Sequence, residues 1–259
     1  VNDLTYLSEH DIQALEPELS ATGGLLSPST GIVSAHEYML ALQGEVETHG
    51  GVVSPLSEVT QIVFEKGAYR VSVSIGDQGE VFHFLATRVI NAAGLGATKV
   101  AANTVGLSPD RVPEMYLCRG NYFSMSGKNP FRHLIYPVPP QSGAGLGIHA
   151  TIDLGNQVKF GPDVEYIDSE RYDVNSSRLQ TYYEAIRRYF PGIQEGSLAP
   201  SYAGIRPKLQ GPGDLPKDFL IQDESVVGLP GVVNLFGVES PGLTASLAIA
   251  EEVAGLFRG

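Results

Sequence analysis

Helical periodicity is clearest near the start of the chain. A Ser cap at Ser8 and an acidic first turn precede an apolar stretch that ends at Pro17, which predicts one short helix. A loop rich in Gly, Ser and Pro follows from 22 to 32. The segment 34–48 then carries apolar residues at helical spacing and ends at Gly50, so a second helix is predicted there.

From residue 51 the pattern of apolar positions changes to period two. Apolar and polar residues alternate in short runs broken by Gly67 and Gly76, which predicts strands joined by tight turns. These strands are expected at 52–53, 59–64, 69–75, 81–85 and 89–90. A second β-rich section is expected from 112 to 162, with short strands at 121–125, 134–138, 147–152 and 157–160.

The last third of the chain returns to helices. An amphipathic helix is predicted at 176–190, and the chain then passes back through 203–208. A strand at 232–237 and a closing helix at 243–257 complete the pattern. The order of helix, sheet, second sheet, helix and return predicts a mixed α/β protein of two domains, the first of them discontinuous in sequence.

The composition limits the cellular compartments and the binding partners that we expect. With 42% hydrophobic residues, 18% charged residues and a net charge of −12, the chain is typical of a folded acidic protein that does not bind nucleic acid. The single Cys118 excludes an intrachain disulfide and a thiolate metal cluster, and no metal site is predicted. No apolar stretch reaches the roughly 18 residues of a transmembrane helix. We expect a cytoplasmic protein, with a targeting signal ahead of Val1 left open.

Five motifs together resemble one family. In chain order they are Leu15–Leu19 (LEPEL), Ser29–Val33 (STGIV), Val89–Gly96 (VINAAGLG), Gly204–Lys208 (GIRPK) and Phe236–Thr244 (FGVESPGLT). Their order and spacing resemble the D-amino-acid-oxidase-like flavoproteins, over nearly the whole chain. The resemblance implies an FAD-dependent oxidoreductase with a Rossmann-like FAD-binding domain and an antiparallel-sheet substrate domain.

Further motifs resemble the 2-hydroxyglutarate dehydrogenase branch more than the amine oxidases. They are Arg119–Phe123, Ile135–Pro139, Gly145–His149 and Asp218–Phe219. The resemblance implies four segments: 1–48, helices and loops on the substrate side; 49–107, first part of the FAD-binding domain; 108–202, substrate-binding antiparallel-sheet domain; and 203–259, second part of the FAD-binding domain.

One departure from the family pattern concerns the phosphates of FAD. The family begins with a strand, a Gly-rich turn and a helix that hold the pyrophosphate, but this sequence contains no G-x-G-x-x-G. The run Gly143–Gly147 leads into a strand-like segment, so it is not expected to bind phosphate. We therefore expect the first βαβ unit to lie upstream of Val1.

The cofactor residues implied by the resemblance lie after two strands. Small residues after the first strand let backbone amides approach a flavin, and the amides that open the last helix favour negative charge on it. The alternatives are an ordinary Gly-rich strand exit and a simple helix cap by Ser240 or Thr244. The predicted FAD contacts are Val59, Asn91, Ala92, Ala93, Gly94, Leu95, Gly204, Ser240, Pro241, Gly242, Leu243 and Thr244.

Substrate binding and acid–base chemistry need a cation and a group that titrates near neutrality. Arg206 is predicted to hold the substrate carboxylate through two parallel hydrogen bonds, with Tyr122 as a further donor. Arg119, Lys208 or Arg132 is predicted to meet a second acidic group. His149, and next His36, is the expected base for the hydroxyl proton. Each residue also has a structural alternative: surface Arg, core Tyr or structural His.

Three functions remain open at this stage. The first is oxidation of a small 2-hydroxy acid, such as 2-hydroxyglutarate, to the 2-oxo acid by hydride transfer to FAD. The second is oxidation of an amine, as in glycine or sarcosine oxidases. The third is a non-catalytic fragment. The substrate is expected to be a small anion; the electron acceptor (oxygen, a quinone or a carrier protein) and the oligomeric state are left open.

Overall fold

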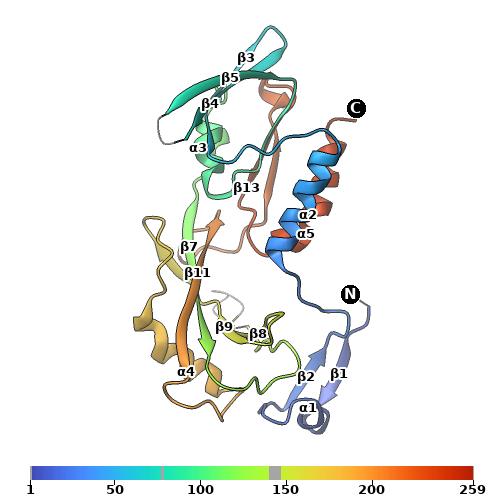
Figure 1. Cartoon of the computed structure of the whole chain (residues 1–259), viewed down its shortest axis with the longest axis vertical. Coiled ribbons are helices and arrows are strands. Elements are labelled where there is room, and N and C mark those ends of the chain that lie inside the picture. Colours follow the sequence, from blue (N-terminus) through green and yellow to red (C-terminus); the bar gives the residue numbers. More distant parts are fainter. Residues whose placement is uncertain (1, 77–78, 140–146, 259) are drawn as a thin grey trace. The chain divides into compact units, whose positions relative to one another are not determined.

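The computed structural model describes residues 2–76, 79–139 and 147–258 (Figure 1). The chain forms two compact units, each made of two segments. Unit 1 comprises Val1–Ser34 and Cys118–Ile205, and unit 2 comprises Ala35–Leu117 and Arg206–Gly259. The boundaries at 34, 117 and 205 stand against predicted boundaries at 48, 107 and 202. The assignment of the segments to a cofactor side and a substrate side stays a prediction.

Unit 1 is built on an antiparallel sheet. Its strands run in the order β10-β7-β9-β8, and the fifth strand, β11, also pairs with β7. A small hairpin of β1 and β2 flanks helix α1, and helix α4 follows a short 3₁₀ turn at Ser176–Arg178. The elements are β1 Thr5–Ser8, α1 Glu9–Leu15, β2 Gly23–Leu26, β7 Tyr116–Met125, β8 His149–Ile152, β9 Val158–Gly161, β10 Glu165–Ile167, α4 Leu179–Arg187 and β11 Leu198–Lys208.

The core of unit 1 lies between this sheet and α4. The helix buries Tyr182, Tyr183 and Ile186 on one face, and the strands contribute Phe123 and Phe160. The Phe123 and Tyr182 rings lie 4.6 Å apart, centroid to centroid. Aromatic side chains of this size supply most of the apolar area that a small core buries, so the α4 face fixes where the helix sits on the sheet.

Unit 2 combines two three-stranded sheets with three helices. One sheet is the antiparallel meander β3-β4-β5; in the other, β13 lies between β12, which is antiparallel to it, and β6, which is parallel. Helix α2 lies beside α5 (Figure 1), where the Tyr38 and Ser246 hydroxyl oxygens are 3.0 Å apart. The elements are α2 Ala35–Thr48, β3 Ser57–Glu65, β4 Ala68–Ile75, β5 Glu80–Ala86, β6 Val89–Asn91, α3 Ala97–Ala102, β12 Leu220–Asp223, β13 Val232–Phe236 and α5 Gly242–Gly255, with 3₁₀ turns at Gly94–Gly96, Pro109–Arg111 and Ser225–Val227.

Most of the predicted elements are confirmed, with three corrections. The predicted strand at 134–138 forms only one bridge, between Ile135 and Ala150, because Pro137 lacks the N–H that would extend the pairing. Residues 52–53 form no strand. The predicted loop 22–32 begins with strand β2. Two consecutive glycines are typical of a turn, but here they start a strand that pairs with β1.

Of the Gly143–Gly147 run, 143–146 lie outside the described residues. No helix within the described ranges is long and apolar enough to cross a membrane.

Gly161 provides a test of the packing in unit 1. Its φ is +143°, and a Cβ added there would lie 2.5 Å from the backbone oxygen of Asn121 and 2.9 Å from the Tyr122 ring. Gly161→Ala should therefore lower the free energy of unfolding by about 2–3 kcal/mol, measured by urea denaturation. Gly31→Ala is the control, because nothing lies within 4 Å of a Cβ at that position. Equal stability of the two variants would contradict the close approach.

Candidate functional site

The turn after β6 is held by the side chain of Asn91. This residue is 4% exposed, and its amide nitrogen donates to the Ala97 oxygen and to Asn234 Oδ1, both at 2.8 Å. Its Oδ1 accepts from the Ala93 nitrogen at 3.3 Å. Gly94 has φ +55°, a left-handed conformation that Gly adopts without strain. The buried amide thus shapes the turn, while Ala92 and Ala93 are exposed.

The same hydrogen bonds continue across the sheet to a buried acid. Asn234 Nδ2 donates to Glu224 Oε1 at 2.8 Å, and Arg111 Nε donates to Glu224 Oε2 at 3.0 Å. Glu224 has no exposed surface. Each buried polar group of this network has a partner. The network therefore fixes the register of β6 against β13 and ties the segment before β7 to them.

The second predicted cofactor segment opens helix α5. Pro241 occupies the cap position and no side chain caps the helix, so the suggested cap by Ser240 or Thr244 is wrong; the Thr244 hydroxyl donates instead to the Pro241 oxygen, at 2.9 Å. A Cβ at Gly242 would lie 2.6 Å from Val238 Cγ1, so a larger residue there would require the Val238 side chain to move. Lys208 Nζ donates to Glu239 Oε1 at 2.5 Å, with both side chains largely buried, and this ion pair fixes the start of the turn.

A cavity of about 740 Å³ runs along β6 and α5 within unit 2. Ala92, Gly94 and Gly242 line it near the two turns, and most of the remaining lining is apolar. Small residues at the two turns and a mainly apolar wall suit a flat ring system with a few polar edges. The size and lining of the cavity therefore fit the flavin part of FAD. The other lining residues are Arg88, Ile90, Leu235, Val238, Ser246, Ile249, Ala250, Val253, Ala254, Phe257 and Arg258.

The remaining predicted cofactor residues lie on other elements or on the surface. Val59 is half-buried on β3, next to a register shift between Val59 and Gln61. Gly204 lies on β11, where a Cβ would meet open space. Leu95 is half-buried in the 3₁₀ turn after Gly94. Their contact with FAD stays a prediction, as does that of exposed Ser240, Pro241, Leu243 and Thr244.

The predicted base His149 begins strand β8 in unit 1. It is 6% exposed, and the Tyr136 ring packs against its imidazole with centroids 4.1 Å apart. The other predicted base, His36, is exposed in the first turn of α2, in unit 2. The role of base stays a prediction for both residues.

Tyr122 stacks on Tyr202 in unit 1. The two rings are 4.5 Å apart and nearly parallel, and Lys159 Nζ lies 5.8 Å from the Tyr202 ring. Burial raises the pKa of Tyr202, opposed by the Lys159 charge and a hydrogen bond with Tyr122. Arg206 is half-buried on β11. Alternation along that strand directs Tyr202 and Arg206 to the same side of it.

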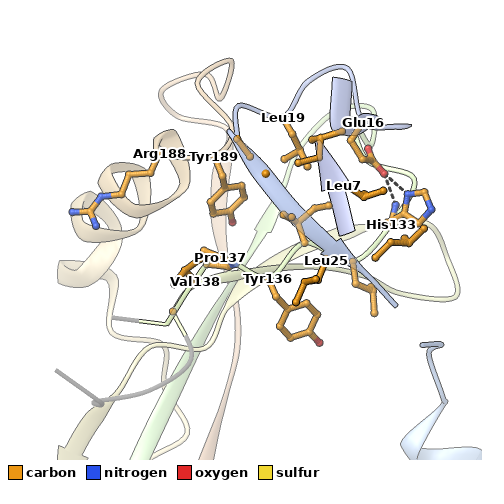
Figure 2. A pocket seen from close by; sticks show the side chains of 18 of the residues that line it. Leu7, Glu16, Leu19, Leu25, His133, Tyr136, Pro137, Val138, Arg188 and Tyr189 are labelled. Carbon is orange, nitrogen blue, oxygen red and sulfur yellow. Dashed lines mark hydrogen bonds and ion pairs between the residues drawn. The ribbon is translucent and has the colours of Figure 1, made fainter. Parts of the chain in front are cut away.

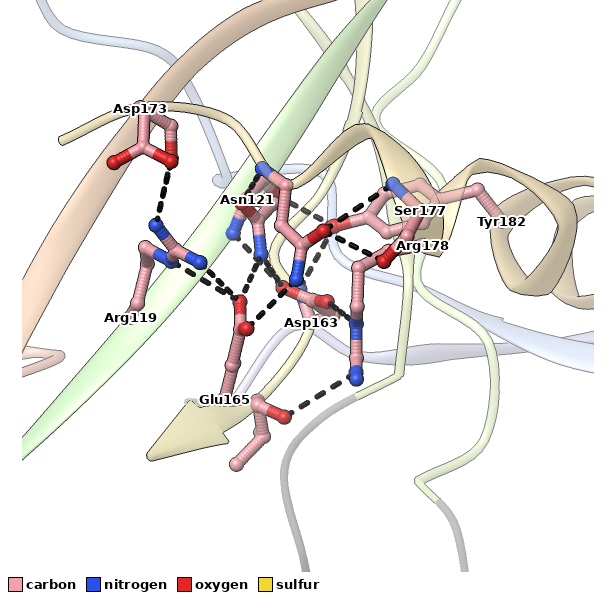
Figure 3. A network of polar contacts seen from close by, with 10 residues as sticks. Arg119, Asn121, Asp163, Glu165, Asp173, Ser177, Arg178 and Tyr182 are labelled. Carbon is pink, nitrogen blue, oxygen red and sulfur yellow. Dashed lines mark hydrogen bonds and ion pairs between the residues drawn. The ribbon is translucent and has the colours of Figure 1, made fainter. Parts of the chain in front are cut away.

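Arg119 is engaged in an internal network (Figure 3). Its side chain is 3% exposed; Nη2 lies 3.0 Å from Glu165 Oε2 and Nη1 lies 3.3 Å from Asp173 Oδ2. Asn121 joins Glu165 to Asp163, which is paired in turn with Arg178. The predicted substrate role of Arg119 stays a prediction, but the guanidinium already has two carboxylate partners.

Two residues that the sequence analysis did not single out form a close pair in unit 1. Glu16 is 4% exposed, and its Oε1 lies 2.7 Å from Nδ1 of His133. The sequence offered two signals for Glu16: its place in the Leu15–Leu19 motif and its position directly before Pro17 at the end of a predicted helix. Nothing in sequence pointed to His133, which lies 117 residues away.

Comparison with known proteins identifies the family. The model of the FAD dependent oxidoreductase family matches residues 1–256. The chain belongs to this family. It is 40% identical over 294 residues to the mitochondrial L-2-hydroxyglutarate dehydrogenase of Arabidopsis thaliana, covering 99% of this chain and 60% of that protein. It thus spans less than two thirds of that relative.

Two solved structures share the fold of this chain. L-α-glycerophosphate oxidase from Mycoplasma pneumoniae with FAD bound matches with a TM-score of 0.75 and 23% identity, over 100% of this chain and 65% of that chain. Glycine oxidase from Bacillus cereus matches with a TM-score of 0.76 and 19% identity, over 98% and 65%. The predicted resemblance, mixed α/β fold and FAD dependence are therefore confirmed.

The Arg119 network generates a prediction about pH. Burial raises the pKa of Glu165, but hydrogen bonds from Asn121, Asn175 and Arg119 outweigh it, so this pKa is below its ordinary value of 4.5. A lowered folded-state pKa contributes stability that is complete above the ordinary pKa and is lost as the pH falls through the lowered value. Glu165→Gln should lower the free energy of unfolding by about 2 kcal/mol at neutral pH. The difference in this free energy between the variant and the wild type should shrink towards about pH 3.

Urea unfolding at a series of pH values measures this difference. Glu65→Gln is the control, because the Glu65–Arg70 pair is much more exposed than the Glu165–Arg119 pair and its loss should leave stability nearly unchanged. A gap between Glu165→Gln and wild type that stays constant down to pH 3 would show that the charge of Glu165 does not stabilise unit 1.

Proposed function

We propose that this chain is the larger part of an FAD-dependent dehydrogenase that oxidises L-2-hydroxyglutarate, or a similar small 2-hydroxy acid, to the 2-oxo acid. The observation that carries the proposal is the 40% identity to an L-2-hydroxyglutarate dehydrogenase over 99% of the chain. The similarities to the glycerophosphate and glycine oxidases support the fold alone.

The turns around the unit 2 cavity would hold the flavin. The segment from Asn91 to Leu95 and the start of α5 from Ser240 to Thr244 offer backbone amides, and the positive end of the α5 dipole favours negative charge nearby. Bound FAD supplies the two-electron acceptor for the hydride on the substrate carbon. Val59 and Gly204 are further proposed contacts.

Side chains of this chain bind the substrate and accept its proton. His149 accepts the hydroxyl proton as the C–H bond breaks, and Arg206 holds the carboxylate in a bidentate grip that fixes which hydrogen is transferred. Tyr122 donates a further hydrogen bond to the substrate. His36 is the second candidate base. The electron acceptor that completes turnover is oxygen, a quinone or a carrier protein.

A visible absorption spectrum tests the reaction class. Protein purified from the complete gene should show flavin bands that bleach under anaerobic L-2-hydroxyglutarate and persist with glycine or sarcosine. Bleaching by an amine but not by the hydroxy acid would contradict the proposal and show that the protein is an amine oxidase. A colourless protein that gains no flavin on incubation with FAD would favour a non-catalytic role.

Arg206→Lys tests the carboxylate site. A lysine keeps the positive charge but loses the two parallel hydrogen bonds, so KM for L-2-hydroxyglutarate should rise about tenfold or more. Steady-state kinetics on the complete gene product measure the effect. Arg171→Lys, on an exposed residue, is the matched control and should leave KM unchanged. An unchanged KM in Arg206→Lys would remove this residue from the site.

A further inference from the structure

Unit 1 contains a second cavity, distinct from the cavity along β6 and α5. It has a volume of about 470 Å³ and lies among α1, the β1–β2 hairpin, the segment 133–138 and the end of α4 (Figure 2). Most of its lining is apolar, including Leu7, Ile12, Leu19 and Ile148. A mainly apolar space of this size, with few polar groups, is typical of a small-molecule site.

Glu16 is one of the residues that line this cavity, and its carboxylate is held in one orientation. Its Oε1 accepts three hydrogen bonds: from the Arg132 nitrogen at 2.8 Å, the His133 nitrogen at 2.7 Å and His133 Nδ1 at 2.7 Å. Three donors converging on one oxygen require that atom to be the acceptor. The other oxygen, Oε2, is therefore fixed in place as well.

Oε2 of Glu16 is buried without a hydrogen-bond partner, and among the described residues it is the one buried side-chain oxygen or nitrogen in that state. An unpaired buried carboxylate oxygen has lost its water without compensation. The arginine of the lining, Arg188, does not reach Oε2. Figure 2 shows Arg188 on the opposite side of the cavity, with its guanidinium pointing away.

We propose that this cavity binds a small molecule with an apolar body and one hydrogen-bond-donating head, such as a primary alkylammonium, and that the head donates to Glu16 Oε2. The apolar wall takes the body, and the negative charge of Glu16 favours a cationic donor. A ligand reaches Oε2 when the side chains that cover it give way. The new hydrogen bond compensates for that movement.

Two probes of similar size and opposite hydrogen-bonding character test the proposal on the 259-residue chain. Hexylamine is protonated at neutral pH and can only donate, whereas 2-heptanone can only accept. Titrations followed by methyl NMR should show hexylamine shifting the signals of Leu7, Leu19 and Ile148, and binding about tenfold more tightly than the ketone. No shift of these methyls at millimolar hexylamine, or equal affinity for both probes, would overturn the proposal.

Glu16→Gln should reverse this preference. The three N–H donors require the amide oxygen to take the place of Oε1, which puts the NH₂ group where Oε2 was. The cavity then presents a donor, so hexylamine should weaken about tenfold and 2-heptanone should become the tighter ligand. Unchanged relative affinities in a folded Glu16→Gln protein would show that Oε2 makes no contact with the ligand.

A second pair of variants locates the binding without touching Glu16. Leu25 lines the cavity and is 64% exposed, so Leu25→Trp should fill the mouth and abolish binding of both probes. Tyr6→Trp is the control, because Tyr6 pairs with Leu25 in the same hairpin, is 80% exposed and does not line the cavity. Retained hexylamine binding in Leu25→Trp would place the ligand elsewhere and overturn the assignment, even if Glu16→Gln fails to fold.

Discussion

The hydrogen bond between Asn91 and Asn234 is the contact on which the candidate cofactor site depends. It joins β6 to β13 through side chains that are 4% and 1% exposed, in the interior of the parallel pair. A shift of one residue in this pairing would leave two amides, and Glu224 behind them, without partners in a place that water does not reach. The register of the strands is therefore set by polar groups, and the turn that follows Asn91 is fixed with it.

Buried polar groups in unit 1 are also paired with one another, and one atom of Glu16 is the exception among the described residues. Arg119, Asn121, Asp163 and Glu165 are each satisfied by neighbours drawn from β7, β10 and the segment before α4. Such a network strongly penalises any arrangement that breaks part of it, because the remaining charges are then buried unpaired. Against this background the unpaired oxygen of Glu16 is an exception. A buried unsatisfied atom of this kind requires an explanation, and the ligand proposed above supplies one.

The sequence predicts well those features that depend on residues close together in the chain, and poorly those that depend on distant residues. The β-meander from Ser57 to Ala86 and the cap at Ser8 depend on neighbours a few residues apart, and both are confirmed. The ordered motifs identified the family for the same reason, since each is a short stretch of consecutive residues. The partners of Arg119 and of Glu16 lie 46 and 117 residues away, so no local pattern contained them. The strand at 134–138 failed because apolar residues predicted pairing that proline does not allow.

The distribution of cations bears on how an acidic protein holds an acidic substrate. With a net charge of −12, the chain repels anions overall, and local cations must reverse that field. Two of the predicted substrate cations are already paired: Arg119 with Glu165 and Asp173, and Lys208 with Glu239. Moving either towards a substrate would leave a carboxylate unpaired and largely buried, at a cost of several kcal/mol. Arg119 and Lys208 are therefore better placed to keep β7 and the α5 turn in position than to bind a substrate, and the carboxylate contact proposed for Arg206 stays a prediction.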